Sequence, residues 1–298
     1  MNYYNEIKNE LINNEINKRV KDYSKNRSDL QTYYNIGKLL SEAGKHYGEG
    51  IIKEYSKRLS NELGKGYGIS SLKNMRQFYV FFSKSQTMSG QLTWSHYIEL
   101  LKLNDLNSIN YYINICAKQN LSVRQLRQRI KNNEYERLSQ ETKDKLINKE
   151  ELKVHDLVKN PIVINNSNNM EVIHEKGLQK LILEDISSFL DELGSGFCFI
   201  KNEYKIKVGN VYDYIDLLLF NYQYNCFVVV ELKVTELKKD HIGQIEVYMN
   251  YIDNNLRQVT QDKTIGIIIV KKDNKYIMEY CSDKRILSKE YKITTSIL

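Results

Sequence analysis

Two charged side chains, Glu231 and Lys233, follow a short apolar run in the stretch CFVVVELKV (226–234). Successive side chains of a β-strand point to opposite faces, so a strand here would place Glu231 and Lys233 together and Leu232 on the other face. A carboxylate and an ammonium in such a strand lose their hydration, which is unfavourable unless they pair or perform chemistry. The pattern therefore points to a buried reactive centre.

A third charged residue, Asp216, interrupts the preceding apolar run, VYDYIDLLLF (211–220). If the two runs pair as a hairpin through NYQYN, Asp216 approaches Glu231, and two such carboxylates repel each other unless a cation lies between them. Mg²⁺ or Mn²⁺ suits this position because both ions prefer oxygen ligands. A divalent ion would polarise a phosphate ester and activate water, while Lys233 would stabilise developing negative charge. The alternative is a structural salt-bridge network of the same three side chains.

The second half of the chain alternates between helical periodicity and strand-like apolar runs. A helix is predicted over 178–190, and the order of elements that follows is β-β-β-α-β-β. The continuous run FVVV is typical of a strand that is buried on both faces of a sheet. The predicted elements after the first helix are strands at 196–208, 211–220 and 226–234, a helix at 240–256, and strands at 264–272 and 275–281.

The first half of the chain reads as helices. The segment IIKEYSKRLSNEL leads into the glycine-rich GKGYG, and Ser70 or Ser71 could then cap a second helix, SLKNMRQFYVFF. Helix, glycine turn and helix is the outline of a helix-turn-helix. The polar face of the second helix carries side chains of the types that contact phosphates and base edges, namely Lys73, Asn74, Arg76 and Gln77.

The excess of basic residues lies in the first half. Residues 1–150 contain 25 Lys and Arg against 16 Asp and Glu, a net charge of +9, whereas residues 151–298 contain 19 against 21, a net charge of −2. A basic half beside a near-neutral half is typical of a nucleic-acid-binding module joined to another activity. The segment SVRQLRQRI adds Arg124 and Arg127 to the predicted DNA contacts. The same excess could be an ordinary solvated surface, or the first half could mainly bind protein.

We therefore expect two domains. Residues 1–145 are predicted to form an all-α, helix-turn-helix-like DNA-binding domain, residues 146–170 a linker, and residues 171–298 an α/β domain. The linker segment is polar and contains both the only proline, Pro161, and the run NNSNN.

Several other classes of protein are disfavoured. The four cysteines are widely spaced and form no CxxC pair, which argues against a zinc site, and Cys198 and Cys226 lie in apolar runs and are expected in the core. No apolar stretch reaches 18 residues and the N-terminus is polar, so neither a membrane helix nor a signal peptide is expected. The expected location is the cytoplasm.

Asp216 followed by Glu231, Leu232 and Lys233, in an α-β-β-β-α-β order, resembles the PD-(D/E)XK nuclease superfamily. The resemblance extends over nearly the whole chain and is closest to the YhcG family. In the nuclease half it is carried by FLDELGSGFCFI, YKIKVGNVYDYIDLLLF, CFVVVELKV and HIGQIEVYMNYID, and in the helical half by YYNIGKLL, LSNELGKGYGISSLKNMRQFY, QLTWSHYIELL and SVRQLRQRI.

This resemblance implies a restriction-endonuclease-like α/β domain, with a central mixed sheet flanked by helices, behind an all-α N-terminal domain. It implies a Mg²⁺- or Mn²⁺-dependent deoxyribonuclease, an endonuclease rather than an exonuclease. Asp216 and Glu231 would be metal ligands, together with the backbone carbonyl of Leu232. Lys233 would be the catalytic lysine, and Gln244, on the helix after the strand, would orient water or phosphate.

The sequence departs from the superfamily pattern at two positions. Ile215 stands where a proline commonly precedes the aspartate, a change that divergent members share. The first helix of the domain usually supplies a glutamate, and the aligned residue here is Gln179. Glu175, one helical turn earlier, could substitute as a metal ligand. A site that binds one metal ion, or binds it weakly, is therefore an open alternative.

The predicted partner is DNA, with no membrane association, and a homodimer would allow each subunit to cut one strand. The competing hypothesis is a catalytically inactive nucleic-acid-binding or assembly protein that retains the nuclease fold, and Gln179 is its best support. The intact set of Asp216, Glu231 and Lys233 argues against it.

Overall fold

The computed structural model describes residues 3–20, 25–64, 66–83, 89, 91–166 and 174–294. The chain divides into two compact units, Met1–Lys131 and Asn132–Leu298. This division falls earlier than the end of the predicted helical domain, and part of the predicted linker, 146–170, belongs to the second unit as helix α9 (Val154–Leu157) and strand β1 (Ile162–Asn165).

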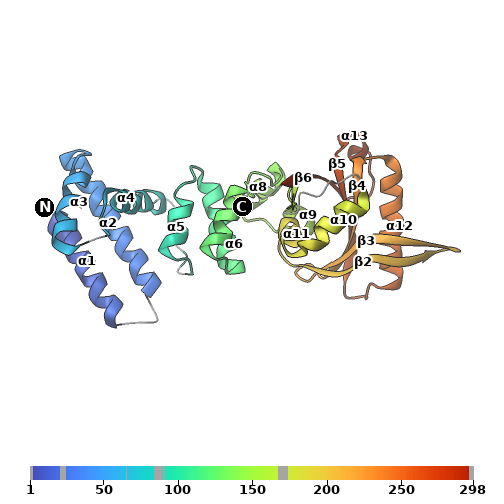
Figure 1. The fold of residues 1–298 in the computed structure, drawn as a ribbon, viewed down its shortest axis with the longest axis horizontal. Helices are drawn as coiled ribbons and strands as arrows, with labels where there is room; N and C mark the ends of the chain where they lie inside the picture. Colours follow the sequence, from blue (N-terminus) through green and yellow to red (C-terminus); the bar gives the residue numbers. More distant parts are fainter. Residues whose placement is uncertain are drawn as a thin grey trace. The chain divides into compact units, whose positions relative to one another are not determined.

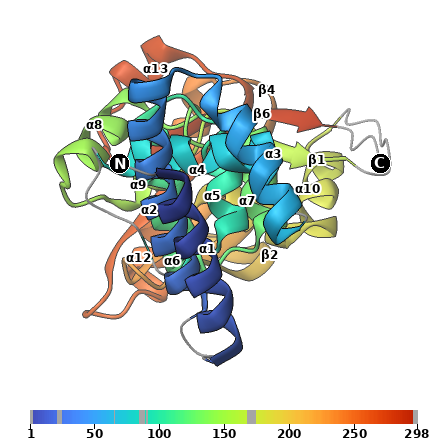
Figure 2. The same ribbon diagram turned by 90° about the vertical axis from the view of Figure 1, so that its left-hand side faces the viewer.

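The described residues of the first unit form helices joined by turns and loops, with no strand among them. Helix α1 lies alongside α2, as Figure 2 shows, and their apolar faces share a core with α3 and α4 that includes Ile7, Leu40, Leu59 and Leu72. The helices are α1 (Tyr3–Val20), α2 (Lys25–Tyr47), α3 (Ile51–Leu63), α4 (Ile69–Phe82), α5 (Trp94–Leu100), α6 (Leu106–Gln119) and α7 (Val123–Lys131).

Helices α3 and α4 are joined by the glycine-rich turn that the sequence indicates. Gly64 and Gly66 have φ angles of 92° and 120°, which side chains other than glycine rarely adopt. The predicted caps Ser70 and Ser71 lie inside α4, because the helix begins at Ile69 with Gly68 in the N-cap position. The helix thus begins two or three residues earlier than the capping signal indicated.

The second unit is built on a six-stranded mixed sheet in the order β1-β6-β5-β4-β3-β2. The pairs β1–β6, β6–β5 and β5–β4 are parallel, while β4–β3 and β3–β2 are antiparallel. The remaining strands are β2 (Phe197–Val208), β3 (Val211–Asn221), β4 (Cys226–Glu236), β5 (Asp262–Lys272) and β6 (Ile286–Thr294).

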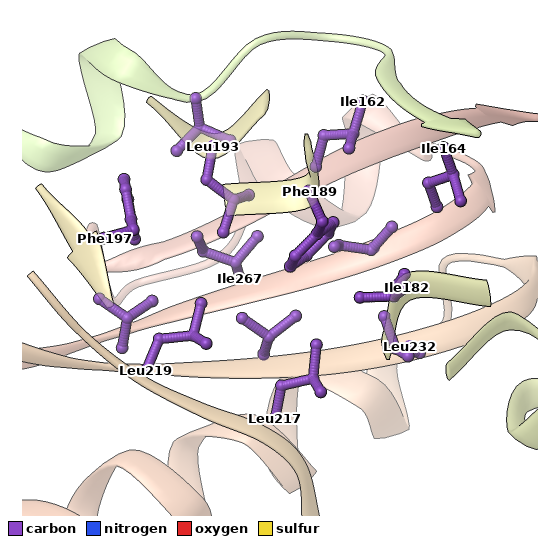
Figure 3. Close-up of a cluster of buried hydrophobic side chains, with 14 of the residues drawn as sticks. Ile162, Ile164, Ile182, Phe189, Leu193, Phe197, Leu217, Leu219, Leu232 and Ile267 are labelled. Carbon is purple, nitrogen blue, oxygen red and sulfur yellow. The ribbon is translucent and has the colours of Figure 1, made fainter. Parts of the chain in front are cut away.

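Helices cover both faces of this sheet, which is why the strands β4 and β5 are apolar along their length (Figure 1). Helices α10 (Glu175–Glu184) and α11 (Ile186–Leu193) pack on one face, and α12 (Lys239–Asn255) packs on the other. Figure 3 shows the first of these cores, where Phe189 and Leu193 of α11 and Ile182 of α10 meet Leu232 and Ile267 of the sheet.

Several local expectations differ from the structure. The helix predicted over 178–190 is two helices that meet at Asp185, and the segment predicted as a strand at 275–281 contains helix α13 (Lys275–Glu279). Helix α8 (Gln140–Asn148) completes the second unit. All four cysteines are reduced thiols, and Cys198 is exposed where we expected it in the core, while Cys226 is buried. Across the described ranges, every helix is too short or too polar to cross a bilayer.

Candidate active site

Strands β3 and β4 separate at the position of the two predicted carboxylates. Their pairing ends at Leu217 opposite Val230, and one further step in the same register places Asp216 opposite Glu231. Beyond that point β3 continues along β2, and β4 continues along β5. Asp216 and Glu231 therefore lie at a fork in the sheet, where β3 and β4 no longer pair with each other.

The backbone around the fork holds Asp216 in place. The amide of Leu232 donates a hydrogen bond of 2.8 Å to Asp216 Oδ2, and the amide of Asp216 lies 3.5 Å from Glu231 Oε1. The side-chain amide of Gln179, on α10, donates a 3.0 Å hydrogen bond to the backbone carbonyl of Asp216. Gln179, which carries no charge, thus positions the strand that bears Asp216.

Lys233 joins the carboxylates of two elements. Its ammonium Nζ lies 3.2 Å from Glu231 Oε2 and 3.7 Å from Glu175 Oε2 of α10. The side chains of Lys233 and Glu231 are 10% and 2% exposed, whereas that of Glu175 is 44% exposed. The structure therefore brings Glu175 to the same site as Asp216, Glu231 and Lys233.

The electrostatics of the site favour an added cation. Burial, and next the charge of Asp216, raise the pKa of Glu231 to about 8. Burial also raises the pKa of Asp216. Burial alone would lower the pKa of Lys233, but the carboxylates of Glu231 and Glu175 hold that pKa above its ordinary value. One ammonium shared among three carboxylates leaves negative charge that is poorly compensated.

This donor set fits a hard divalent ion. Asp216 and Glu231 offer carboxylate oxygens, and Mg²⁺ binds through one or two carboxylates while keeping several waters. Among the described residues no group of three or more His, Cys, Asp and Glu side chains is arranged to hold a metal ion by itself. The fit is therefore to an ion that completes its shell with backbone oxygen and water.

Helix α12 adds a second set of polar groups. The side-chain amide of Gln244 donates a 2.8 Å hydrogen bond to the hydroxyl of Tyr248, which in turn hydrogen-bonds Asp213 of β3. Gln244 is thus bound to Tyr248 rather than to either carboxylate of the fork. Tyr248 and Asp213 were not singled out from the sequence, although the spacing of four residues from Gln244 on a helix is a signal that could have found Tyr248.

Glu203 is another acidic residue that the sequence did not indicate. It lies on β2 between the pairs Asn202–Leu217 and Tyr204–Ile215, across from Asp216, and its charge contributes to the raised pKa of Asp216. Its φ angle is +46°, in the left-handed region. No sequence pattern predicts that Glu203, in the middle of a strand, has a left-handed backbone conformation.

Two of the six residues predicted to contact DNA in the first unit form ion pairs with acidic side chains. The guanidinium of Arg76 pairs with Glu49 at 2.7 Å, and that of Arg127 pairs with Glu99 at 2.7 Å. The remaining four have mixed environments: Gln77 donates to the backbone carbonyl of Leu101, Asn74 is half-buried, and Lys73 and Arg124 are exposed.

Comparison with protein-family models matches both halves of the chain. Residues 155–297 match the YhcG PDDEXK nuclease domain, and residues 8–137 match the DUF1016 N-terminal domain. The chain belongs to the YhcG nuclease family. The position of the YhcG-family nuclease domain agrees with the second unit, which contains the fork with Asp216, Glu231 and Lys233.

A named relative of the YhcG family is also similar to this chain in sequence. The chain is 25% identical over 309 aligned positions to the protein named Putative nuclease YhcG from Escherichia coli (strain K12), covering 88% of this chain and 82% of that protein.

Solved structures resemble a smaller part of the chain. A repair endonuclease from Pyrococcus abyssi is 16% identical, with a TM-score of 0.29, over 43% of this chain and 49% of that one. A complex of EndoMS with double-stranded DNA is 18% identical, also with a TM-score of 0.29, over 44% of this chain and 49% of that one. The chain thus spans about half the length of these solved structures.

Proposed function

We propose that this chain is a divalent-metal-dependent deoxyribonuclease that cuts within DNA strands. The observation that carries the proposal is the fork between β3 and β4, where the half-buried Asp216 and the buried Glu231 lie close enough for their charges to interact, beside the ammonium of Lys233. Membership of a nuclease family supports the reaction class.

Asp216, Glu231 and the backbone carbonyl of Leu232 would hold the metal ion, Mg²⁺ or Mn²⁺. The ion would supply Lewis-acid polarisation of the phosphate and a lowered pKa for a bound water. Glu175 of α10 lies within ion-pair distance of Lys233, and its half-exposed carboxylate can turn toward the same ligand set.

Lys233 has the properties of a group that stabilises charge rather than one that exchanges a proton. The neighbouring carboxylates hold its pKa above the ordinary value, so it stays an ammonium at neutral pH. Positive charge fixed in a buried site stabilises the negative charge that develops on phosphate oxygens as the phosphodiester bond is broken.

The roles of Gln179 and Gln244 are to position other groups. Gln179 fixes the carbonyl of Asp216, so the first helix of this domain contributes a hydrogen bond where a carboxylate would have added a ligand. This substitution favours a mechanism with one metal ion. Gln244, which the buried Tyr248 holds on α12, could turn toward a phosphate or a water by leaving that hydrogen bond.

The first unit would bind DNA outside the cut site. Lys73 on α4 and Arg124 on α7 are exposed and basic, as phosphate contacts require. Because Arg76 and Arg127 pair with Glu49 and Glu99, they would have to leave these partners before contacting DNA. Cutting both strands of a duplex would further require two active sites, which a homodimer would supply.

A panel of DNA substrates tests the proposal. The purified chain is incubated with Mg²⁺, Mn²⁺ or EDTA and with closed circular, linear, nicked, branched and single-stranded DNA. We expect cleavage with a divalent ion and none in EDTA, and cutting of a closed circle would identify an endonuclease. Absence of cleavage of every substrate with both ions would contradict the proposal and favour an inactive DNA-binding or assembly protein.

A further inference from the structure

Strands β2 and β3 continue past the fork as a two-stranded arm, residues 204–215, which we call the hairpin arm. Its pairing runs from Tyr204 opposite Ile215 to Val208 opposite Val211. Figure 1 shows the hairpin arm reaching beyond α12 and the other strands of the sheet. Asp216 is the residue that immediately follows the arm in β3.

The two faces of the hairpin arm differ. One face packs toward α12, because Ile206, Ile215 and Tyr204 belong to the same apolar cluster as Tyr248 of that helix. Residues directly opposite in an antiparallel pair share a face. The pairs Lys205–Tyr214 and Lys207–Tyr212 therefore lie together on the other face of the arm, which we call the tyrosine–lysine face.

The tyrosine–lysine face is open and basic. Tyr212 and Tyr214 are 55% and 50% exposed. The ammonium of Lys205 lies 3.9 Å from the centre of the Tyr212 ring, a cation–π contact. The one acidic residue of the arm, Asp213, is on the opposite face, where it hydrogen-bonds Tyr248. Exposed aromatic side chains that gather on one face, with basic groups beside them, are typical of a surface that binds a partner.

We propose that the tyrosine–lysine face binds unpaired nucleotides of the DNA strand beside the scissile phosphate. Bases would stack on Tyr212 and Tyr214, while Lys205 and Lys207 would contact the phosphates that link them. Single-strand-binding surfaces combine the same two elements, aromatic rings for bases and basic groups for the backbone. The location relative to the cut depends on the proposed function, whereas binding itself does not.

The position of the arm defines the kind of substrate. Tyr214 and Tyr212 precede Asp216 by two and four residues in β3. At about 3.4 Å per strand residue these rings lie about 7 and 14 Å from Asp216, which equals about two and four base steps of one DNA strand. Bases inside an intact duplex are stacked on each other and cannot reach the rings. The arm therefore selects DNA that is unpaired within a few nucleotides of the cut.

Binding measurements on the full chain test this inference. Lys233→Ala serves as the non-cutting parent, in EDTA, and fluorescence anisotropy reports affinity for a labelled single strand and for the matching duplex. Replacing both Tyr212 and Tyr214 with Leu keeps apolar bulk and removes the rings. We expect the affinity for the single strand to fall on the order of tenfold or more, and the affinity for the duplex to change little. The matched control replaces Tyr276 and Tyr280, which are 78% and 83% exposed in the same unit, with Leu, and it should bind both DNAs as the parent does.

A photo-crosslink locates the contact independently. A single strand carrying 5-iododeoxyuridine is irradiated with the parent protein, and the modified peptide is identified by mass spectrometry. Crosslinks at Tyr212 or Tyr214 support the inference. Crosslinks elsewhere, or a double Leu variant that binds the single strand as tightly as the parent, would overturn it. Both measurements report binding and not cleavage. The inference can therefore hold for a chain that cuts no DNA, and it can be wrong for a chain that does cut DNA.

Discussion

Asp216 and Glu231 face each other across the point where β3 and β4 separate, with the amide of Asp216 3.5 Å from Glu231 Oε1. Burial raises the pKa of both carboxyl groups, the charge of Asp216 raises that of Glu231 further, and the nearby Lys233 offsets only part of the shift. This relationship underlies the predictions on metal binding, pH dependence and catalysis.

Asp216→Asn should weaken binding of Mn²⁺, measured by isothermal titration calorimetry. The substitution removes one ligand charge but keeps the side-chain oxygen that accepts from the amide of Leu232. In EDTA the variant should melt no lower than the parent, because one of two repelling carboxylates is gone. Asp213→Asn, three residues earlier in β3, is the matched control and should bind Mn²⁺ normally. Equal Mn²⁺ affinity in the two variants would count against Asp216 as a ligand.

The stability of the metal-free protein should depend on the ionisation of Glu231. Its pKa in the folded state is raised from 4.5 to about 8, with burial as the main cause. The neutral acid therefore stabilises the fold below about pH 4.5, and this contribution is lost as the pH rises through about 8. We expect the Tm in EDTA to decline over that range more for the parent than for Glu231→Gln, and Mn²⁺ to reverse the decline. Parallel Tm curves for the two proteins would show that Glu231 ionises normally.

Gln179→Leu should slow cleavage at saturating DNA by roughly 10- to 100-fold, as loss of groups that orient metal ligands commonly does. The variant loses the hydrogen bond to the carbonyl of Asp216 while retaining similar bulk. Asn255→Leu, at the end of α12, is a matched control, since it loses a similar side-chain amide bond, to the carbonyl of Tyr251. If both variants cut at the parental rate, Gln179 does not position Asp216.

Reversing the charges of Lys73 and Arg124 to Glu should weaken binding of duplex DNA and reduce its salt dependence. Each lost phosphate contact lowers the slope of log affinity against log salt by about 0.9. Lys118→Glu, an exposed lysine on α6, controls for net charge. An unchanged salt slope in the double variant would indicate that the first unit binds protein rather than DNA.

The mixed sheet flanked by helices, confirmed here, could be predicted because its central strands are long and apolar. The runs around Val229 and Leu218 are buried on both sides, and burial of this kind leaves a continuous apolar signature. The three charged residues of the fork stood out for the same reason, since each interrupts such a run. The position of the carboxylates relative to each other followed from the hairpin connection.

Elements at the edge of the sheet were harder to predict. Strand β1 has four residues, Ile162–Asn165, in a polar segment, too short for a period of two to be evident. The apolar residues of α13 are equally compatible with a strand, and their context in the fold decides for the helix. The left-handed backbone at Glu203 and the exposed face with Tyr212 depend on tertiary geometry, which local sequence patterns do not encode.

Lys233→Ala tests directly whether Lys233 is catalytic, with cleavage and thermal melting measured side by side. The variant should lose at least roughly 100-fold in cleavage rate, while its Tm and its binding of Mn²⁺ stay close to those of the parent. Lys159→Ala is the contrasting control, because Lys159 is a buried structural lysine that pairs with Glu134 at 3.4 Å, and its loss should destabilise the fold by roughly 3–5 kcal/mol. A Lys233→Ala protein that unfolds as Lys159→Ala does, from a parent that cuts no DNA with either metal, would contradict a catalytic role and leave a structural ion-pair network in its place.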